Sequence, residues 1–138
     1  MSDQQVQSNP EQAAWVREQF QKANGYLVEK GILTDQVLVK ESRYLMPHVA
    51  LWKFTERGTT EKVWAITGVC PTDHVDAKVA GDAREALKHF CLRWQLRADT
   101  ILNDPKSDAT QQKFANLLIN HAEACYELVE QKDLWEGS

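Results

Sequence analysis

Two apolar segments joined by a polar loop constrain the fold of this chain more than any other feature. His48–Phe54 alternates along a strand and carries large apolar side chains on both faces, and Val63–Thr67 is a second apolar run. The polar stretch Glu56–Lys62, centred on Gly58, lies between them. This arrangement predicts a β-hairpin. Apolar side chains on both faces indicate a strand inside the sheet, or one covered on both sides.

Three segments with apolar residues at helical spacing surround this hairpin. The first ends at Gly31, a residue type that commonly closes helices, and the second ends before Pro105, which disfavours helical geometry in the preceding residue. A short connection joins the second and third segments, which predicts an antiparallel pair. The expected N-terminal caps are Asn9, Asp82, and Ser107 or Asp108.

The order of these segments predicts an α+β fold. We expect an N-terminal helix, a small antiparallel sheet of about three strands that includes the hairpin, and two long antiparallel helices. Val37–Lys40 is the candidate for the additional strand. The 138 residues suffice for one domain with its own core. We therefore expect a disordered tail over residues 1–8 and a single domain over residues 9–138.

Charge and cysteine content favour a cytoplasmic protein that binds neither nucleic acid nor membranes. The net charge of -4 gives no basic footprint, and the cationic ridge Arg84–Arg97 is interrupted by acidic residues, as on a solvated helix face. No apolar run approaches the ~18 residues of a membrane span, and the polar N-terminus has no signal-peptide pattern. Three scattered cysteines form neither a disulfide framework nor a zinc motif, and no cofactor fingerprint is present.

The polar residues that follow the second apolar run are the candidate site. Cys70, Asp73 and His74 supply a thiol, a carboxylate and an imidazole within five residues. A Cys–His pair is one option for covalent chemistry, and His48 with Asp73 and His74, and His89 as a further candidate, is an option for a metal. Neither option has the spacing of an established motif. The alternative, which we favour, is a structural turn after Pro71 whose side chains hydrogen-bond to backbone amides.

A second candidate surface lies at the other end of the chain. Leu134 and Trp135 form an apolar pair within a polar C-terminal tail. An exposed aromatic residue of this kind is typical of a contact with a protein partner or a second subunit.

The sequence also resembles a known family. The stretches that carry the resemblance are Trp64-Ala-Ile-Thr-Gly68, Pro71-Thr-Asp-His74, Ala83-Arg-Glu-Ala-Leu-Lys-His-Phe90 and Arg93-Trp-Gln-Leu96. They are similar to a family of short, uncharacterised bacterial proteins classed as a domain of unknown function, over most of the chain from about Trp15 to the third helix. The resemblance implies a cytosolic bacterial protein of single-domain size. It assigns no catalytic or binding residue.

These observations favour a small cytosolic interaction or adaptor protein without catalytic activity. The alternative is a small-molecule or metal-binding pocket, and thus a possible enzyme, around Cys70, Asp73, His74 and His48. This second function requires the four side chains to converge in one cleft.

Overall fold

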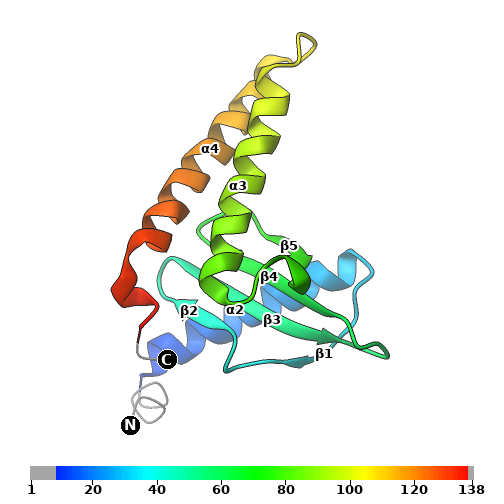
Figure 1. Cartoon of the computed structure of the whole chain (residues 1–138), viewed down its shortest axis with the longest axis vertical. Helices are drawn as coiled ribbons and strands as arrows, with labels where there is room; N and C mark the ends of the chain where they lie inside the picture. Colours follow the sequence, from blue (N-terminus) through cyan, green and yellow to red (C-terminus); the bar gives the residue numbers. More distant parts are fainter. Residues whose placement is uncertain (1–8, 137–138) are drawn as a thin grey trace. The chain divides into compact units, whose positions relative to one another are not determined.

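The structure is a computed structural model that describes residues 9–136, and the predicted tail over residues 1–8 lies outside them. The chain divides into two compact units, one up to Lys78 and one from Val79. The first unit contains a helix and the whole β-sheet, and the second contains two long helices (Figure 1). The α+β class is confirmed, and the described residues form five strands where about three were expected.

The N-terminal helix α2 runs over Pro10–Glu29. Asn9 caps it, because its side-chain oxygen accepts a hydrogen bond of 3.1 Å from the Gln12 amide. Gly31 follows the helix with a φ of 81°, a left-handed conformation that glycine adopts without steric cost. Both ends therefore match the expectation from the sequence.

The sheet consists of antiparallel strands in the order β1-β3-β4-β5, and β2 also pairs with β3. The central pair, β3 and β4, forms the predicted hairpin, with Trp52 opposite Ala65 and Phe54 opposite Val63. The strands span Thr34–Val37 (β1), Arg43–Leu45 (β2), Val49–Glu56 (β3), Lys62–Gly68 (β4) and Asp73–Asp76 (β5). Both β1 and β2 lie along the same side of β3, so together they form an interrupted edge strand.

Helix α2 packs against one face of this sheet (Figure 1). The shared core contains Ala23 and Leu27 from the helix, and Trp52, Phe54 and Ala65 from the central strands. Opposite faces alternate along each strand, and residues of the other face, such as Leu51, Trp64 and Ile66, are also buried. Apolar residues therefore occupy both faces of the hairpin, as its sequence predicts.

Gly68 ends β4 with a φ of 125°. A Cβ atom at this position would lie 2.7 Å from the Cα of Val49 and closer still to the carbonyl oxygen of His48. No other residue fits here without moving the neighbouring strand.

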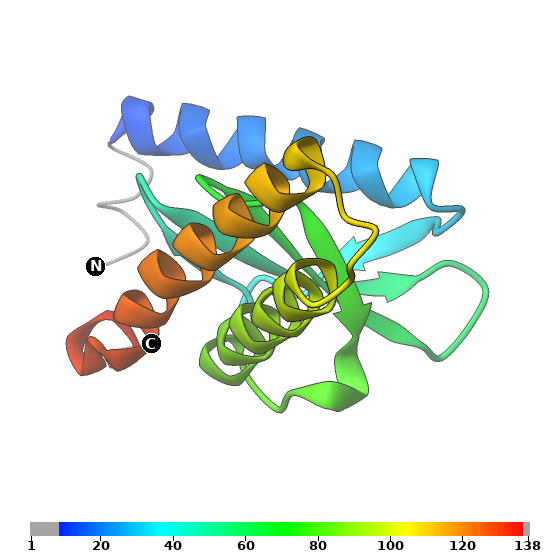
Figure 2. The ribbon, with the colours of Figure 1, turned by 90° about the horizontal axis from the view of Figure 1, so that it is seen from above.

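The second unit is a pair of antiparallel helices, which Figure 2 shows side by side. Helix α3 runs over Ala83–Leu102 and is capped by Asp82. Helix α4 runs over Ala109–Glu130, with a capping box between Asp108 and Gln111. Both caps match the sequence expectation. No helix in the described part of the chain is both long and apolar enough to span a membrane.

Side chains near the middle of the two helices form the core of this unit. Phe90 and Trp94 stack with their ring centroids 6.1 Å apart, and Leu118 is buried on α4. The Cys91 and Cys125 thiols meet across the helix pair. Their mutual hydrogen bond and their burial raise the pKa of Cys91, which keeps that thiol protonated and unreactive.

Candidate functional site

Asp73 and His74 lie on a strand, β5, and not in a turn. Asp73 pairs with Ile66 and His74 pairs with Ala65, so their side chains project from opposite faces of the sheet. The Asp73 carboxylate accepts a 2.8 Å hydrogen bond from the His74 backbone amide. The expected turn over these residues is thus corrected to a fifth strand, although the expected carboxylate–amide bond is present.

His74 faces helix α2 and is held there by a tyrosine. The Tyr26 hydroxyl lies 3.0 Å from Nδ1 of His74, and the two rings meet edge to face at 5.4 Å. The Lys30 ammonium lies 5.4 Å from the centre of the Tyr26 ring. These contacts connect the end of α2 to the edge strand β5, which is a structural role for the imidazole.

His48 and Cys70 lie near each other on the backbone but away from His74. The His48 carbonyl accepts a hydrogen bond of 2.8 Å from the Val69 amide, and Cys70 follows in the loop after β4. His74 lies on β5, which β4 separates from β3. It is level with Trp52 on β3, four residues along the chain from His48. Standard strand dimensions then separate the Cα atoms of His48 and His74 by roughly 15 Å. The structure does not gather the four predicted residues into one cleft.

Metal-ligating side chains are likewise dispersed. Across residues 9–136, no three His, Cys, Asp or Glu side chains are grouped so that they could hold one ion. His89 and His121 belong to the second unit, on α3 and α4 respectively.

An apolar groove lies beside α2, at the interrupted edge of the sheet. Its volume is about 420 Å³. The lining residues come from α2 and from β1, β2 and β3, and they are Ala13, Val16, Arg17, Phe20, Val37, Tyr44 and Trp52. The sequence marks Val16 and Phe20 as apolar helix positions, but helical spacing does not show whether a helix face is fully covered. The groove was therefore not predicted.

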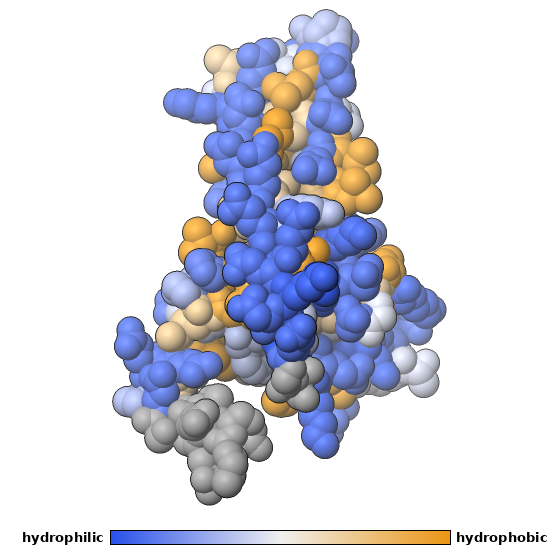
Figure 3. All heavy atoms as spheres, turned by 60° about the vertical axis from the view of Figure 1, so that its left-hand side comes forward, coloured by the Kyte–Doolittle hydropathy of each residue, from blue (hydrophilic) through white to orange (hydrophobic). Residues whose placement is uncertain are grey.

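The helical unit exposes several large apolar side chains. On α4, Phe114 is 39% exposed and Leu117 is 50% exposed. Figure 3 shows hydrophobic surface among hydrophilic residues over this unit, at the top of the view. On α3, the Arg97 guanidinium lies 5.3 Å from the centre of the Phe114 ring. Phe114 and Leu117 have the helical spacing of an apolar face, but their exposure places them outside the core of this unit.

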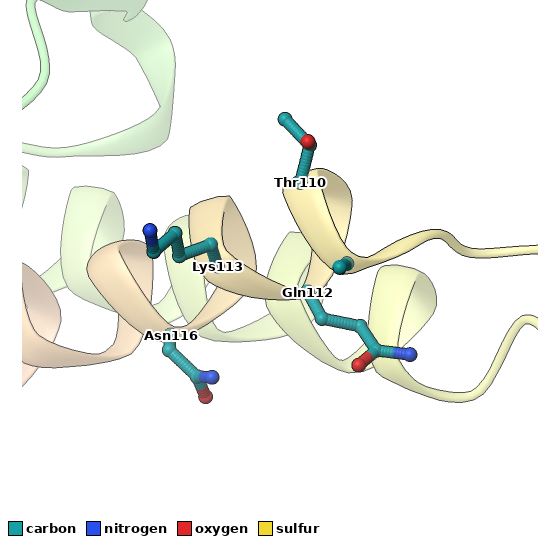
Figure 4. Close-up of a pocket in the computed structure, with 5 residues that line it drawn as sticks. Thr110, Gln112, Lys113 and Asn116 are labelled. Carbon is teal, nitrogen blue, oxygen red and sulfur yellow. The ribbon is translucent and has the colours of Figure 1, made fainter.

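A shallow pocket of about 320 Å³ lies at the start of α4. Figure 4 shows that Thr110 and Lys113 point to one side of the helix and Gln112 and Asn116 to the other. These side chains do not converge on a common point, so they do not form a binding site for a small ligand.

Leu134 and Trp135 follow the last turn of α4. The Trp135 indole N–H donates a 3.0 Å hydrogen bond to the Leu128 carbonyl, one of the last carbonyls of the helix. Both side chains are partly buried. This contact gives Trp135 a role in ending the helix, and its proposed role in partner binding stays a prediction.

A family comparison covers almost all of the described chain. The family model called "Domain of unknown function (DUF4826)" matches residues 9–135. No curated protein and no solved structure matches the chain. The resemblance seen in the sequence is thereby confirmed, and the chain belongs to the DUF4826 family.

Proposed function

We propose that this chain is a small cytoplasmic bacterial protein that acts by binding another protein and not by catalysis. The binding surface is the α3–α4 surface, defined by Arg93, Arg97, Phe114 and Leu117. The observation that carries the proposal is the pair of exposed apolar side chains on α4 beside the Arg97 guanidinium.

The geometry of the helix pair places these four residues together. Leu117 is three residues after Phe114, and Arg93 is four residues before Arg97, so each pair lies on one side of its helix. Because the helices are antiparallel, one turn back on α3 lies beside one turn forward on α4. Arg93 therefore lies alongside Leu117, as Arg97 lies alongside Phe114.

The chemistry of this surface indicates an amphipathic, acidic helix as the partner. Exposed apolar side chains at helical spacing complement the apolar stripe of another helix. Two arginines favour a partner with carboxylates on either side of that stripe. Arginine and aromatic residues are also the types that contribute most to affinity at protein interfaces.

Photo-crosslinking from Leu117 tests this proposal. A photoreactive amino acid replaces Leu117 in the cell of origin, and the crosslinked segment is identified by mass spectrometry. The matched control places the same group at Glu123, another exposed position on α4. We expect position 117, and not position 123, to capture one protein through an amphipathic acidic segment.

Two outcomes would overturn the proposal. The first is equal crosslinking from positions 117 and 123, which would show that contact with α4 is nonspecific. The second is a segment from position 117 without acidic residues, because such a segment would not require the arginines.

A further inference from the structure

The groove beside α2 is the strongest candidate for an additional site; it belongs to the first unit, whereas the α3–α4 surface belongs to the second. Its volume of about 420 Å³ falls within the range of about 300–1,000 Å³ of small-molecule sites. Val16, Arg17 and Phe20 line one side, and Val37 and Tyr44 line the other. The groove lies where the edge of the sheet passes from β1 to β2.

Aromatic rings form the floor and walls of this groove. The Trp52 ring lies 4.8 Å from Tyr44 and 5.6 Å from Phe20, measured between ring centroids. The indole N–H of Trp52 already donates to the Thr67 hydroxyl at 3.2 Å. Trp52 is therefore buried behind Phe20 and Tyr44 and leaves no unsatisfied polar atom at the bottom of the groove, which suits an apolar group.

The polar groups at the rim are hydrogen-bond donors. Arg17 is the charged residue of the lining, and no described residue forms an ion pair with it. Its helical neighbours at positions 13, 14, 20 and 21 include no acid. The Tyr44 phenol is a neutral hydroxyl near pH 7, and burial raises its pKa further above the ordinary value.

We propose that this groove binds a small amphiphilic carboxylate. The apolar part of the ligand lies against the half-buried side chains of Val16 and Phe20, and the carboxylate pairs with the Arg17 guanidinium. The planar fork of arginine matches two carboxylate oxygens, and the groove lining contains no acidic side chain that would repel them.

Two soluble probes of the same shape test this proposal by amide NMR titration: 4-phenylbutyrate and its neutral counterpart 4-phenylbutanol. We expect both to shift the amide signals of Val16, Phe20 and Tyr44. Arg17→Gln should weaken binding of the carboxylate about fivefold and leave binding of the alcohol unchanged. Lys22→Gln is the matched control, because Lys22 is also an exposed cation of α2 but lies outside the groove lining.

A filling substitution separates the apolar contribution from the charge. Ala13→Phe places a ring into the groove from α2 and should abolish binding of both probes while the remaining amide spectrum is preserved. Three outcomes would contradict the proposal. These are no binding of the carboxylate to the unmodified protein, shifts that map to another surface, or equal weakening by Arg17→Gln and Lys22→Gln.

Discussion

The sheet unit and the helical unit treat their apolar residues differently. In the sheet unit, α2 and the central strands share a buried aromatic core, and Trp52 is only 1% exposed. In the helical unit, α3 and α4 bury their small and central residues, whereas Phe114 and Leu117 remain exposed. Burial of a large side chain stabilises the fold, while an exposed one contributes little until another surface covers it. The comparison therefore separates side chains that stabilise the fold from side chains that remain exposed.

The largest expected effect concerns a comparison of two tryptophans, one in each unit. Trp52→Ala removes a buried ring from the core of the sheet unit and should lower the free energy of unfolding by about 3–5 kcal/mol. Trp135→Ala removes one hydrogen bond and a partly buried ring, so it should cost about 1–2 kcal/mol. Urea unfolding monitored by circular dichroism measures both. Equal losses would contradict the comparison.

Two glycines of the sheet unit should respond to alanine in opposite directions. Gly68→Ala forces a side chain into the backbone of β3 at a positive φ and should destabilise the protein by about 2–3 kcal/mol. Gly25→Ala adds a methyl group within α2 with nothing within 4 Å, and should stabilise it by up to about 1 kcal/mol. Thermal unfolding of both variants checks the signs. A neutral Gly68→Ala would show that β3 is not held against this residue.

A half-exposed ion pair of the sheet unit should give a pH-dependent effect. The Lys53 ammonium donates a 2.8 Å hydrogen bond to Glu41, which lowers the pKa of that carboxyl from 4.5. The resulting stabilisation is present above about pH 4.5 and is lost as the pH falls through the lowered pKa. Glu41→Gln should therefore cost up to about 1 kcal/mol at pH 7 and nothing near pH 2.

The matched control for this pair is Glu61→Gln. The Glu61 carboxylate lies 3.5 Å from the Lys78 ammonium, and the Lys78 side chain is 78% exposed. Glu61→Gln should therefore lower the free energy of unfolding by close to zero at either pH. Urea unfolding at the two pH values compares both variants. A Glu41→Gln cost that persists at pH 2 would rule out the ion pair as its cause.

Among the substitutions of apolar residues, the smallest effect on stability is expected at the exposed leucines of the helical unit. Leu117→Asp and Leu92→Asp replace side chains that are 50% and 53% exposed, and each should change the free energy of unfolding by no more than about 0.5 kcal/mol. Chemical unfolding of the two variants measures this. A loss of several kcal/mol at Leu117 would show that it belongs to the core.

The elements with strong local signals could be predicted from the sequence. Asn9, Asp82 and Asp108 mark three helix starts because each cap is a contact between residues three apart. The hairpin of β3 and β4 was predicted from its apolar runs. Strand β5 was missed because Asp73 and Asp76 at its ends are polar, and its strand character depends on pairing with β4.

The candidate site could be predicted less well. Proximity in sequence placed Asp73 beside His74, but strand alternation directs the two side chains to opposite faces. The contact between His74 and Tyr26 joins residues 48 positions apart, and no local pattern encodes it. The groove depends on how completely the interrupted edge strand covers α2, which is a property of packing and not of residue periodicity.

Affinity for the segment captured from position 117 tests the central claim most directly. Isothermal titration calorimetry compares the unmodified protein with Leu117→Asp and Leu92→Asp, whose stabilities should match. Leu92 lies five residues before Arg97, about 140° around α3 from it. We predict that Leu117→Asp weakens binding at least about tenfold and that Leu92→Asp leaves it unchanged. Equal affinities of the two variants would contradict the assignment of the α3–α4 surface to partner binding.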